Sequence, residues 1–399
     1  MRRGLLVVFA LGLVAAAGCS ASRDAMPPSP WKEVAFADVS DDLDPASLAL
    51  AAERTAAALA AKPASPFVLG DRRYETGDLV ASASHVARIA KESDGDRSRL
   101  SLRLARDCRA FASPRPAKVT AYYEPLLEAR RRPDPRFCHP LYAAPSKEQL
   151  EAVTRKLGHA PTRADIDGGQ ALGGLGLEVA WVDDPVARFF LHVQGSGRLV
   201  FADGREARVG YAGNNGLTYR SVGAHMLAEG LLKPGKASAP AMRSWLAAHP
   251  SRRDALLFHN PRYIFFRDTG GEGPIGALGA TLVAGRSVAT DARFVPLGIL
   301  ALLRTTQPVL DRDGALRGER PIERFVFAQD AGAAIEGQAR VDLFWGSGEE
   351  AGAVAGTMNQ AGELLLLVCE RSASPTMRSD PAPRRRVPAI LWRRPGAIR

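Results

Sequence analysis

The chain has 399 residues, of which 46% are hydrophobic and 24% charged. This is enough for two or three compact domains and excludes a disordered or collagen-like protein. The formal net charge of +10 would suit a nucleic-acid partner, but residues 371–399 carry a net +7 and Arg2 and Arg3 add two more. Residues 20–370 hold 43 basic and 42 acidic side chains, so we expect no nucleic acid as a partner.

The N-terminus has the pattern of a secretory signal. Arg2 and Arg3 precede an apolar run over 5–14 that is too short to span a bilayer, and small residues follow up to Cys19. A cysteine directly after Ala-Gly resembles a bacterial lipobox, which predicts a signal peptide over 1–18, lipidation of Cys19 and a periplasmic protein; ordinary cleavage nearby is the alternative. Ser20 after the cysteine favours anchoring in the inner leaflet of the outer membrane.

Three cysteines remain if Cys19 is lipidated: Cys108, Cys138 and Cys369. At most one disulfide can form among them, and the sequence does not say which. No Cys-x-x-Cys occurs and the seven histidines lack metal-ligand spacing, so we expect no metal site and no cofactor.

The predicted elements follow a proline-containing tether over 19–44. Helices are expected over 45–62, with Asp44 as N-cap and Pro45 as first residue, and over 78–92 and 96–111. Later helices are expected at 146–157, 218–230 and 239–258, the first opened by a capping box of Ser146 and Gln149. Short strands are predicted at 119–123, 126–131, 177–182, 188–193, 263–267, 281–289, 299–304, 325–329, 341–345 and 364–369.

The strands of the C-terminal half lie about ten residues or more apart, with Gly and Pro between them. This spacing favours a mainly β fold with peripheral helices, built on a barrel, over helix-crossover units. The basic tail over 371–399 has too little apolar surface to fold and is predicted to be disordered.

Two motifs are set aside. Gly271-x-Gly273-x-x-Gly276 resembles a dinucleotide-binding loop, but a loop and a strand are predicted after it instead of the helix that such a site requires. Asp268-Thr-Gly and Asp330-Ala-Gly resemble the paired loops of aspartic proteases, yet only 62 residues separate them, so a protease is the least favoured alternative.

Three aspartates, Asp291, Asp330 and Asp342, stand at strand ends or turns beside apolar residues and glycine. Any one of them, taken alone, would be explained as accepting hydrogen bonds from the backbone N–H groups of its turn. Together they resemble the three-aspartate (3D) domain of cell-wall-active bacterial proteins, and specifically the membrane-bound lytic transglycosylase A family. The resemblance covers about 119–368 and includes Tyr122-Tyr123-Glu124-Pro125, Ala129-Arg130 and Pro140-Leu141-Tyr142, identified with the first barrel strands, and Val193–Gly197, Gly210–Gly216, Tyr219–Ser221, Asn260-Pro261 and Phe265-Phe266.

The resemblance implies a double-psi β-barrel with an inserted second β domain. The first part of the barrel and its helices would lie in 45–125, the insert in 126–269 and the second part in 270–370. Departures from the family pattern are Glu124 in place of Thr, Ala333 in place of Gly, one extra residue between Asp330 and Asp342, and the Arg-rich tail.

The implied activity is cleavage of the β-1,4 bond between N-acetylmuramic acid and N-acetylglucosamine with a 1,6-anhydro product. The sugar's own 6-hydroxyl is the nucleophile, so a single carboxyl, Asp342, can act as acid and then as base. Its apolar neighbours Val341, Leu343, Phe344 and Trp345 and a nearby carboxylate would raise its pKa. Asp330 is assigned as that carboxylate and Asp291 as a hydrogen-bonding support.

The partners implied are peptidoglycan glycan strands and, further, a cell-wall enzyme complex. Candidate substrate-binding residues are Tyr123, Glu124, Gln194, Ser196, Tyr211 and Asn214, and Trp345 either lines the groove or packs beneath Asp342. Two alternatives stay open: a hydrolase that uses Asp342 and Asp330 on opposite sides of the bond, and a non-catalytic glycan-binding barrel.

Overall fold

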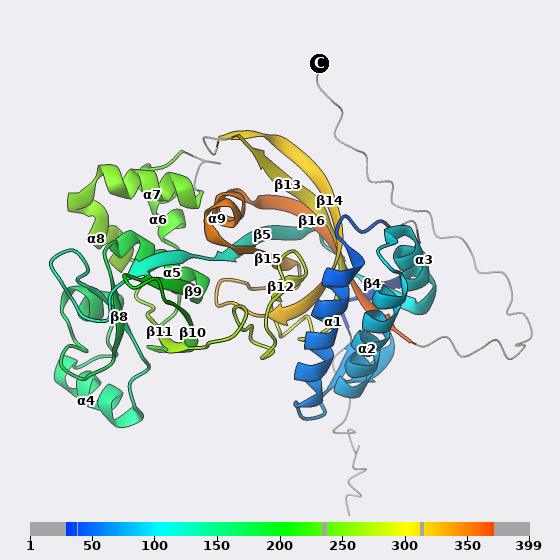
Figure 1. Cartoon of the computed structure of the whole chain (residues 1–399), viewed down its shortest axis with the longest axis horizontal. Helices are drawn as coiled ribbons and strands as arrows, with labels where there is room; N and C mark the ends of the chain where they lie inside the picture. The colour runs from blue at the N-terminus through cyan, green and yellow to red at the C-terminus, as the bar shows by residue number, and fades with distance from the viewer. Residues whose placement is uncertain (1–28, 38, 234–237, 312–314, 371–399) are drawn as a thin grey trace, which may run out of the picture.

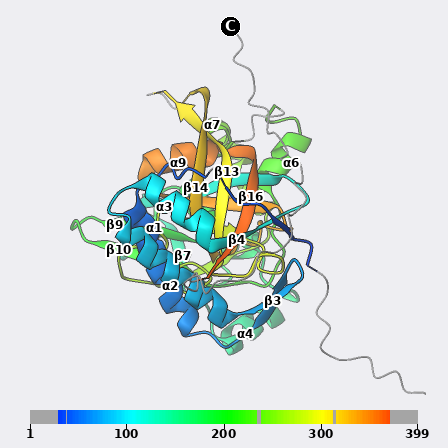
Figure 2. The ribbon, with the colours of Figure 1, turned by 90° about the vertical axis from the view of Figure 1, so that its right-hand side faces the viewer.

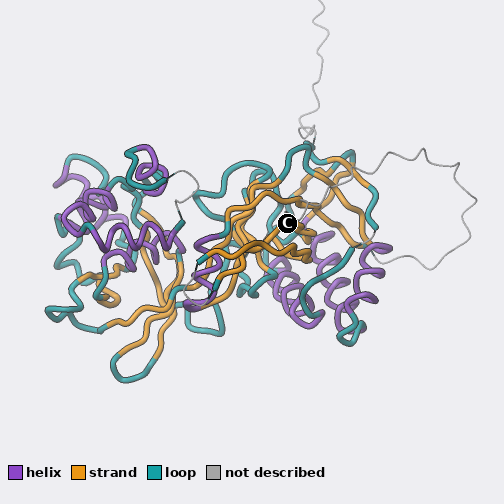
Figure 3. The backbone as a smooth tube through the Cα atoms, turned by 90° about the horizontal axis from the view of Figure 1, so that it is seen from above, coloured by secondary structure: helices purple, strands orange, loops and turns teal. Residues whose placement is uncertain are grey.

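The computed structural model describes residues 29–37, 39–233, 238–311 and 315–370. Two lobes lie side by side, one built around a β-barrel and the other around a smaller sheet (Figure 1 and Figure 3). Cys19 and the basic tail, for which lipidation and disorder are predicted, lie outside the described residues. None of the helices in the described ranges has the length and apolarity needed to cross a bilayer.

Six strands of the described chain close into a barrel in the order β16-β13-β14-β12-β15-β5, with β5 pairing back to β16. Most neighbours are antiparallel, but β12–β14 and β15–β5 are parallel. Two further strands, β4 and β1, extend the sheet from β16. The bounds are β1 Lys32–Val34, β4 Cys108–Ala112, β5 Ala117–Glu124, β12 Ser287–Thr290, β13 Leu300–Leu310, β14 Leu316–Asp330, β15 Arg340–Ser347 and β16 Asn359–Cys369.

The apolar runs at the start of β13 and at the ends of β14 and β16 are buried on both faces. In β13, Ala301 and Leu303 belong to the core inside the barrel, whereas Leu300 and Leu302 pack under the helices outside it. Alternate side chains of a strand point to opposite faces, so one run supplies two cores. The barrel expected from strand spacing is confirmed.

Three helices cover the outside of the barrel (Figure 2): α1 Pro45–Ala60, α2 Thr76–Glu92 and α3 Arg97–Asp107. The predicted cap of α1 is confirmed, because the Asp44 side chain accepts a hydrogen bond from the Ser47 N–H at 2.7 Å. The third helix ends at Asp107, earlier than expected, and residues 108–112 form β4. A short hairpin, β2 Pro66–Leu69 and β3 Arg72–Glu75, connects α1 to α2.

A disulfide joins Cys108 of β4 to Cys369 of β16, which face each other in the strand register. Cys138 is free and exposed. The pair that the sequence left open is therefore Cys108 with Cys369.

The second lobe contains a four-stranded sheet in the order β11-β10-β9-β6 and a separate two-stranded antiparallel sheet of β7 and β8, as far as the described residues go. Helices surround both (Figure 1). The bounds are β6 Leu126–Ala129, β7 His139–Tyr142, α4 Lys147–Leu157, a π-helix Ala164–Gly168, β8 Glu178–Val182, α5 Pro185–Gln194, β9 Ser196–Phe201, β10 Glu206–Asn214, α6 Val222–Ala228, α7 Ala239–Ala248, α8 Pro250–Phe258 and β11 Ile264–Asp268.

The prediction of a strand over 188–193 is wrong, because these residues lie in α5. The Asp184 side chain caps this helix through the Val186 N–H at 2.8 Å, Pro185 is its first residue, and Gly195 ends it in the left-handed conformation. The N-cap, the proline at the first position and the glycine at the end all favour a helix, and they determine the structure more strongly than the apolar run between them.

Three other expectations need correction. The helix over 239–258 is two helices, since Pro250 starts a new one. The strand over 281–289 is confined to Ser287–Thr290, because Gly285 turns the chain with a positive φ. Residues 140–142 pair with β8 and not with the barrel, so among the proposed first barrel strands only β5 belongs to it. Helix α9, Gly348–Thr357, was not expected.

Candidate functional site

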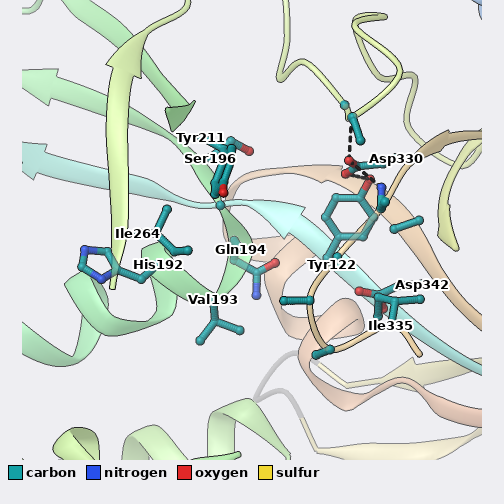
Figure 4. Close-up of a pocket in the computed structure, with 18 of the residues that line it drawn as sticks. Tyr122, His192, Val193, Gln194, Ser196, Tyr211, Ile264, Asp330, Ile335 and Asp342 are labelled. Carbon is teal, nitrogen blue, oxygen red and sulfur yellow. Dashed lines mark hydrogen bonds between the residues drawn. The ribbon is translucent and has the colours of Figure 1, made fainter. Parts of the chain in front are cut away.

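A cavity of about 850 Å³ lies between the two lobes and is lined by residues of both. The barrel contributes Thr120, Tyr122, Asp330, Arg340 and Asp342. The second lobe contributes Gln194, Ser196 and Tyr211 together with His192, Arg262 and Arg267. Figure 4 shows the two aspartates near Tyr122 on one side and Gln194, Ser196 and Tyr211 on the other.

Asp342 lies on β15, between β5 and β12. The parallel register places it opposite Thr120, and the Thr120 hydroxyl hydrogen-bonds Asp342 Oδ1. Arg340 Nη1 donates to Thr120 Oγ1 at 2.9 Å. Burial raises the pKa of Asp342 to about 6, and Asp330 adds to this, while Thr120 and Arg340 act in the opposite direction.

Asp330 ends β14 and is held by three donors. Its Oδ1 accepts from the N–H groups of Ala277 at 2.8 Å and Ala331 at 2.9 Å, and its Oδ2 accepts from the Tyr122 hydroxyl at 2.9 Å. Burial raises the pKa of Asp330, and these three donors oppose that effect. The pKa of Tyr122 is well above its usual value because of burial and the adjacent carboxylate, so its hydroxyl stays a donor.

Asp291 does not line the cavity. Its carboxylate binds the Arg293 guanidinium at 2.6 Å and accepts from the Gly337 N–H at 2.7 Å. These contacts, led by Arg293, lower its pKa to about 2. Asp291 therefore ties the loop after β12 to the loop before β15, the strand that carries Asp342.

Three of the six candidate substrate-binding residues, Gln194, Ser196 and Tyr211, line the cavity. Gln194 ends α5, and its Oε1 accepts from the Tyr123 N–H at 3.0 Å. Ser196 begins β9 and Tyr211 lies on β10 with about half of its surface exposed. An exposed ring beside hydroxyl and amide groups suits a sugar surface.

The structure places the other three candidates elsewhere. The Tyr123 ring packs against Gly352 of α9, whereas Tyr122 faces the cavity. Asn214 holds the Tyr211 hydroxyl from outside the cavity. Glu124 is 1% exposed, where it binds Arg208 at 2.9 Å and the Ser347 hydroxyl at 2.8 Å.

Trp345 and Asp268 also lie outside the lining. Trp345 packs against the barrel core, with the Arg324 guanidinium 5.1 Å from its ring. Asp268 caps its own turn through the Gly270 N–H, so the cavity does not bring together the two carboxylates that an aspartic protease would need.

The sequence reading missed Thr120 and the cavity-lining arginines, and it did not separate Tyr122 from Tyr123. Arg340 could have been predicted beside Asp342, because it lies two residues earlier and alternate residues of a strand share a face. No feature of the sequence predicts the position of Thr120, since that position depends on the register of β5 against β15. Within the described ranges, no cluster of three or more His, Cys, Asp or Glu side chains is arranged to hold a metal ion.

Comparison with known proteins gives a consistent picture. The MltA specific insert domain matches residues 118–267 and the 3D domain matches residues 286–368. Membrane-bound lytic murein transglycosylase A of Vibrio cholerae is 32% identical over 255 residues, which are 63% of this chain and 66% of that protein. The match therefore spans slightly less than two thirds of that relative.

Two solved structures are similar over most of their length. The membrane-bound lytic murein transglycosylase of Agrobacterium tumefaciens is 33% identical with a TM-score of 0.69, and the similarity covers 85% of this chain and 97% of that one. MltA of E. coli with bound chitohexaose is 26% identical with a TM-score of 0.68, over 88% of this chain and 97% of that one.

Proposed function

Because the chain belongs to the membrane-bound lytic murein transglycosylase A family, we propose that it cleaves the β-1,4 bond between N-acetylmuramic acid and N-acetylglucosamine in peptidoglycan, leaving a 1,6-anhydro end. The observation that carries the proposal is Asp342, whose carboxyl lies on the wall of a cavity lined by both lobes and has a pKa raised by burial to about 6. Such an acid is protonated in part near neutral pH and can donate its proton.

The reaction needs one carboxyl and no water. Asp342 protonates the glycosidic oxygen as the bond to the anomeric carbon breaks. The 6-hydroxyl of the muramic acid attacks that carbon and gives its proton to the Asp342 carboxylate, which is thereby restored to the acid. Atoms and charge balance within the sugar and this one side chain.

The hydrogen bonds support Asp342 rather than Asp330 as the group that carries the proton. Asp330 accepts from two backbone N–H groups and a tyrosine hydroxyl, which favour its charged form. Asp342 accepts from Thr120 through Oδ1, while its Oδ2 has no such donor among the described residues. In its charged form, Asp330 adds to the effect of burial and raises the pKa of Asp342 further.

The same family membership supports the finer structural proposals. We infer that the barrel is of the double-psi type, that residues 45–125 and 270–370 contribute its parts, and that 126–269 are the insert. A lipid on Cys19 that holds the protein at the outer membrane is proposed from the sequence, and the relatives are named as membrane-bound.

The test is product analysis on purified sacculi. Asp342→Asn should lower the release of anhydro-muropeptides by about 10²- to 10⁴-fold, the usual contribution of a general acid. Asp268→Asn, a carboxylate outside the cavity, is the matched control and should leave the rate unchanged. Undiminished release from Asp342→Asn would remove this residue from the mechanism.

Mass spectrometry of the wild-type products separates the alternatives. Both Asp330 and Asp342 line the cavity, so a two-carboxylate hydrolase is the second candidate. Its products would be heavier by one water at each new reducing end. Binding to sacculi without any soluble product would instead indicate a non-catalytic glycan-binding protein.

A further inference from the structure

The two walls of the cavity differ in charge. The barrel wall combines the carboxyl groups of Asp330 and Asp342 with the Arg340 guanidinium, whereas the second lobe contributes basic and no acidic side chains, among them Arg262 and Arg267, here called the arginine wall. Residues 20–370 are nearly neutral in total, so this separation is local and not a result of general basicity. A cleft wall with one sign of charge concentrates ligands of the opposite sign.

The two guanidinium groups of the arginine wall have no acidic partner within the described part of the chain. Arg262 Nη1 donates to the Leu217 carbonyl at 3.0 Å, which leaves its other N–H groups free. Arg267 is exposed and its side chain makes no hydrogen bond or ion pair with another described residue. By contrast, Arg163, which also lines the cavity, is occupied by Asp167 at 3.3 Å.

The backbone beneath the arginine wall is held in place. Arg163 Nη2 donates to the Arg262 carbonyl at 2.7 Å and Arg163 Nε donates to the Asn260 carbonyl at 3.2 Å. The Asn260 side chain in turn accepts from the Arg262 N–H at 3.2 Å. The backbone of Arg262 is therefore held in place by these hydrogen bonds. Binding of a ligand to its side chain then requires little additional loss of backbone conformational freedom.

Arg267 is aligned with the sugar-facing part of the sheet. Gly210 of β10 pairs with Arg267 on one side and with Ser196 on the other. Two strand spacings place the Arg267 and Ser196 backbones about 10 Å apart, roughly the length of two sugar units. A glycan strand that contacts Ser196 and Tyr211 would bring its substituents within reach of this arginine.

We propose that the arginine wall binds the carboxylates carried by the muramic acid units of the strand, an inference that rests on the proposed function. N-acetylglucosamine has no ionisable group, so the muramic acid side of the polymer is the source of anions. Two sources share this chemistry: the lactyl carboxylate of strands without peptides and the carboxylates of attached stem peptides. A planar guanidinium binds either one through two parallel hydrogen bonds.

The experiment measures equilibrium binding in the Asp342→Asn protein, so that ligands are not consumed. The ligands are chitohexaose, which has no carboxylate, a peptide-free glycan oligosaccharide of equal length with free lactyl groups, and the same oligosaccharide with stem peptides. We expect the carboxylate-bearing ligands to bind more tightly than chitohexaose. The preference should shrink as ionic strength rises from about 0.01 M to about 1 M, where the screening length falls from about 30 Å to about 3 Å.

Arg267→Gln removes a charge without breaking a hydrogen bond or ion pair to any described residue, and Arg262→Gln removes the second charge. Each substitution should reduce the preference for carboxylate-bearing ligands roughly twofold to fivefold and leave chitohexaose affinity unchanged. Arg155→Gln on α4 is the matched control, because this exposed arginine of the same lobe lies outside the cavity and should have no effect.

The outcomes separate this inference from the function on which it rests. Tighter binding of the peptide-free or of the peptide-bearing ligand supports the inference and identifies the source of the carboxylate. Equal binding of all three ligands overturns the inference, and so does a preference for carboxylate-bearing ligands that persists in both variants. In either case the proposed glycan-binding function is not affected. If none of the three binds, the proposed function fails and the inference fails with it.

Discussion

Thr120 and Asp330 act on the same carboxyl group in opposite directions. The Thr120 hydroxyl stabilises the charged form of Asp342 and so lowers its pKa, whereas the negative charge of Asp330 raises it. Burial, the largest effect, favours the neutral acid. The pH range in which Asp342 can donate a proton is therefore determined by identifiable neighbours.

We predict that activity falls as the pH rises above about 6, because Asp342 then loses the proton that it must donate. Thr120→Val should move this alkaline limb to higher pH, and Asp330→Asn should move it to lower pH. The measurement is the initial rate of anhydro-muropeptide release across the pH range. Thr120→Ser keeps the hydroxyl and serves as the control that follows the wild type; coinciding profiles for all four proteins would refute this assignment.

The raised pKa of Asp342 also has a cost in stability. The carboxyl titrates near 3.8 when exposed and near 6 in the folded protein, so its contribution is fully favourable below about pH 4 and is lost as the pH rises through 6. Asp342→Asn stays neutral at every pH. It should therefore raise the free energy of unfolding at pH 7 by about 1–3 kcal/mol and change it little at pH 4.

Urea unfolding of wild type and Asp342→Asn at the two pH values checks this prediction. An active-site residue whose replacement stabilises the protein is expected where function requires an unfavourable environment. If the difference between the two proteins does not change with pH, the carboxyl is not held in its neutral form by burial.

At the scale of elements, Glu124 connects the two lobes. It ends β5 of the barrel and binds Arg208 of β10, with the Ser347 hydroxyl at the end of β15 as a further partner. Arg198 of β9 lies 3.8 Å away. The residue is completely buried among these groups, so its carboxylate holds the strand ends on both sides of the cavity together.

Glu124→Gln leaves Arg208 without an acidic partner among the described residues, while Arg198 keeps its ion pair with Glu206 at 3.2 Å. The substitution should lower the free energy of unfolding by about 1–3 kcal/mol. Glu128→Gln is the matched control on β6, since this exposed side chain pairs, among the described residues, with Arg136 alone, at 3.5 Å. The substitution should change the free energy of unfolding by less than about 0.5 kcal/mol. Denaturant unfolding compares the two. If both variants unfold at the same denaturant concentration and Glu124→Gln weakens glycan binding, Glu124 binds substrate, as the sequence analysis predicted.

For the whole molecule, the disulfide joins positions 261 residues apart and fastens β4 beside the final barrel strand. A cross-link over so long a loop restricts the unfolded chain strongly. The double variant Cys108→Ala with Cys369→Ala should lose about 2–5 kcal/mol of stability, and reductant should affect the wild type in the same way.

Cys138→Ala provides the control for this prediction, because Cys138 is exposed and outside the disulfide. Thermal unfolding with and without reductant measures all three proteins. A wild-type transition that does not respond to complete reduction would show that the strand pairing alone holds β4 to β16.

Features that depend on neighbouring residues were predictable. The Asp44-Pro45 start of α1 and the capping box of α4 appear where the sequence places them, since a cap uses side chains within three positions. The barrel also follows from strand spacing, and the family follows from motifs around Asp291, Asp330 and Asp342. The error at α5 came from reading an apolar run as a strand although Asp184-Pro185 and Gly195 mark a helix on either side.

Features that depend on distant residues were not predictable. The partner of Cys108, the contact of Thr120 with Asp342 and the arginines opposite the two acids arise from segments more than two hundred residues apart or from facing lobes. Glu124 illustrates the difference: its motif marked it as important, but only the packing of the two lobes made it a buried connection instead of a surface ligand. Helix caps and the alternation of side chains along a strand are determined by local backbone geometry. Strand register and the packing of the two lobes are instead determined by burial of apolar surface over the whole chain. That packing places Asp342, its neighbours and the arginine wall around one cavity.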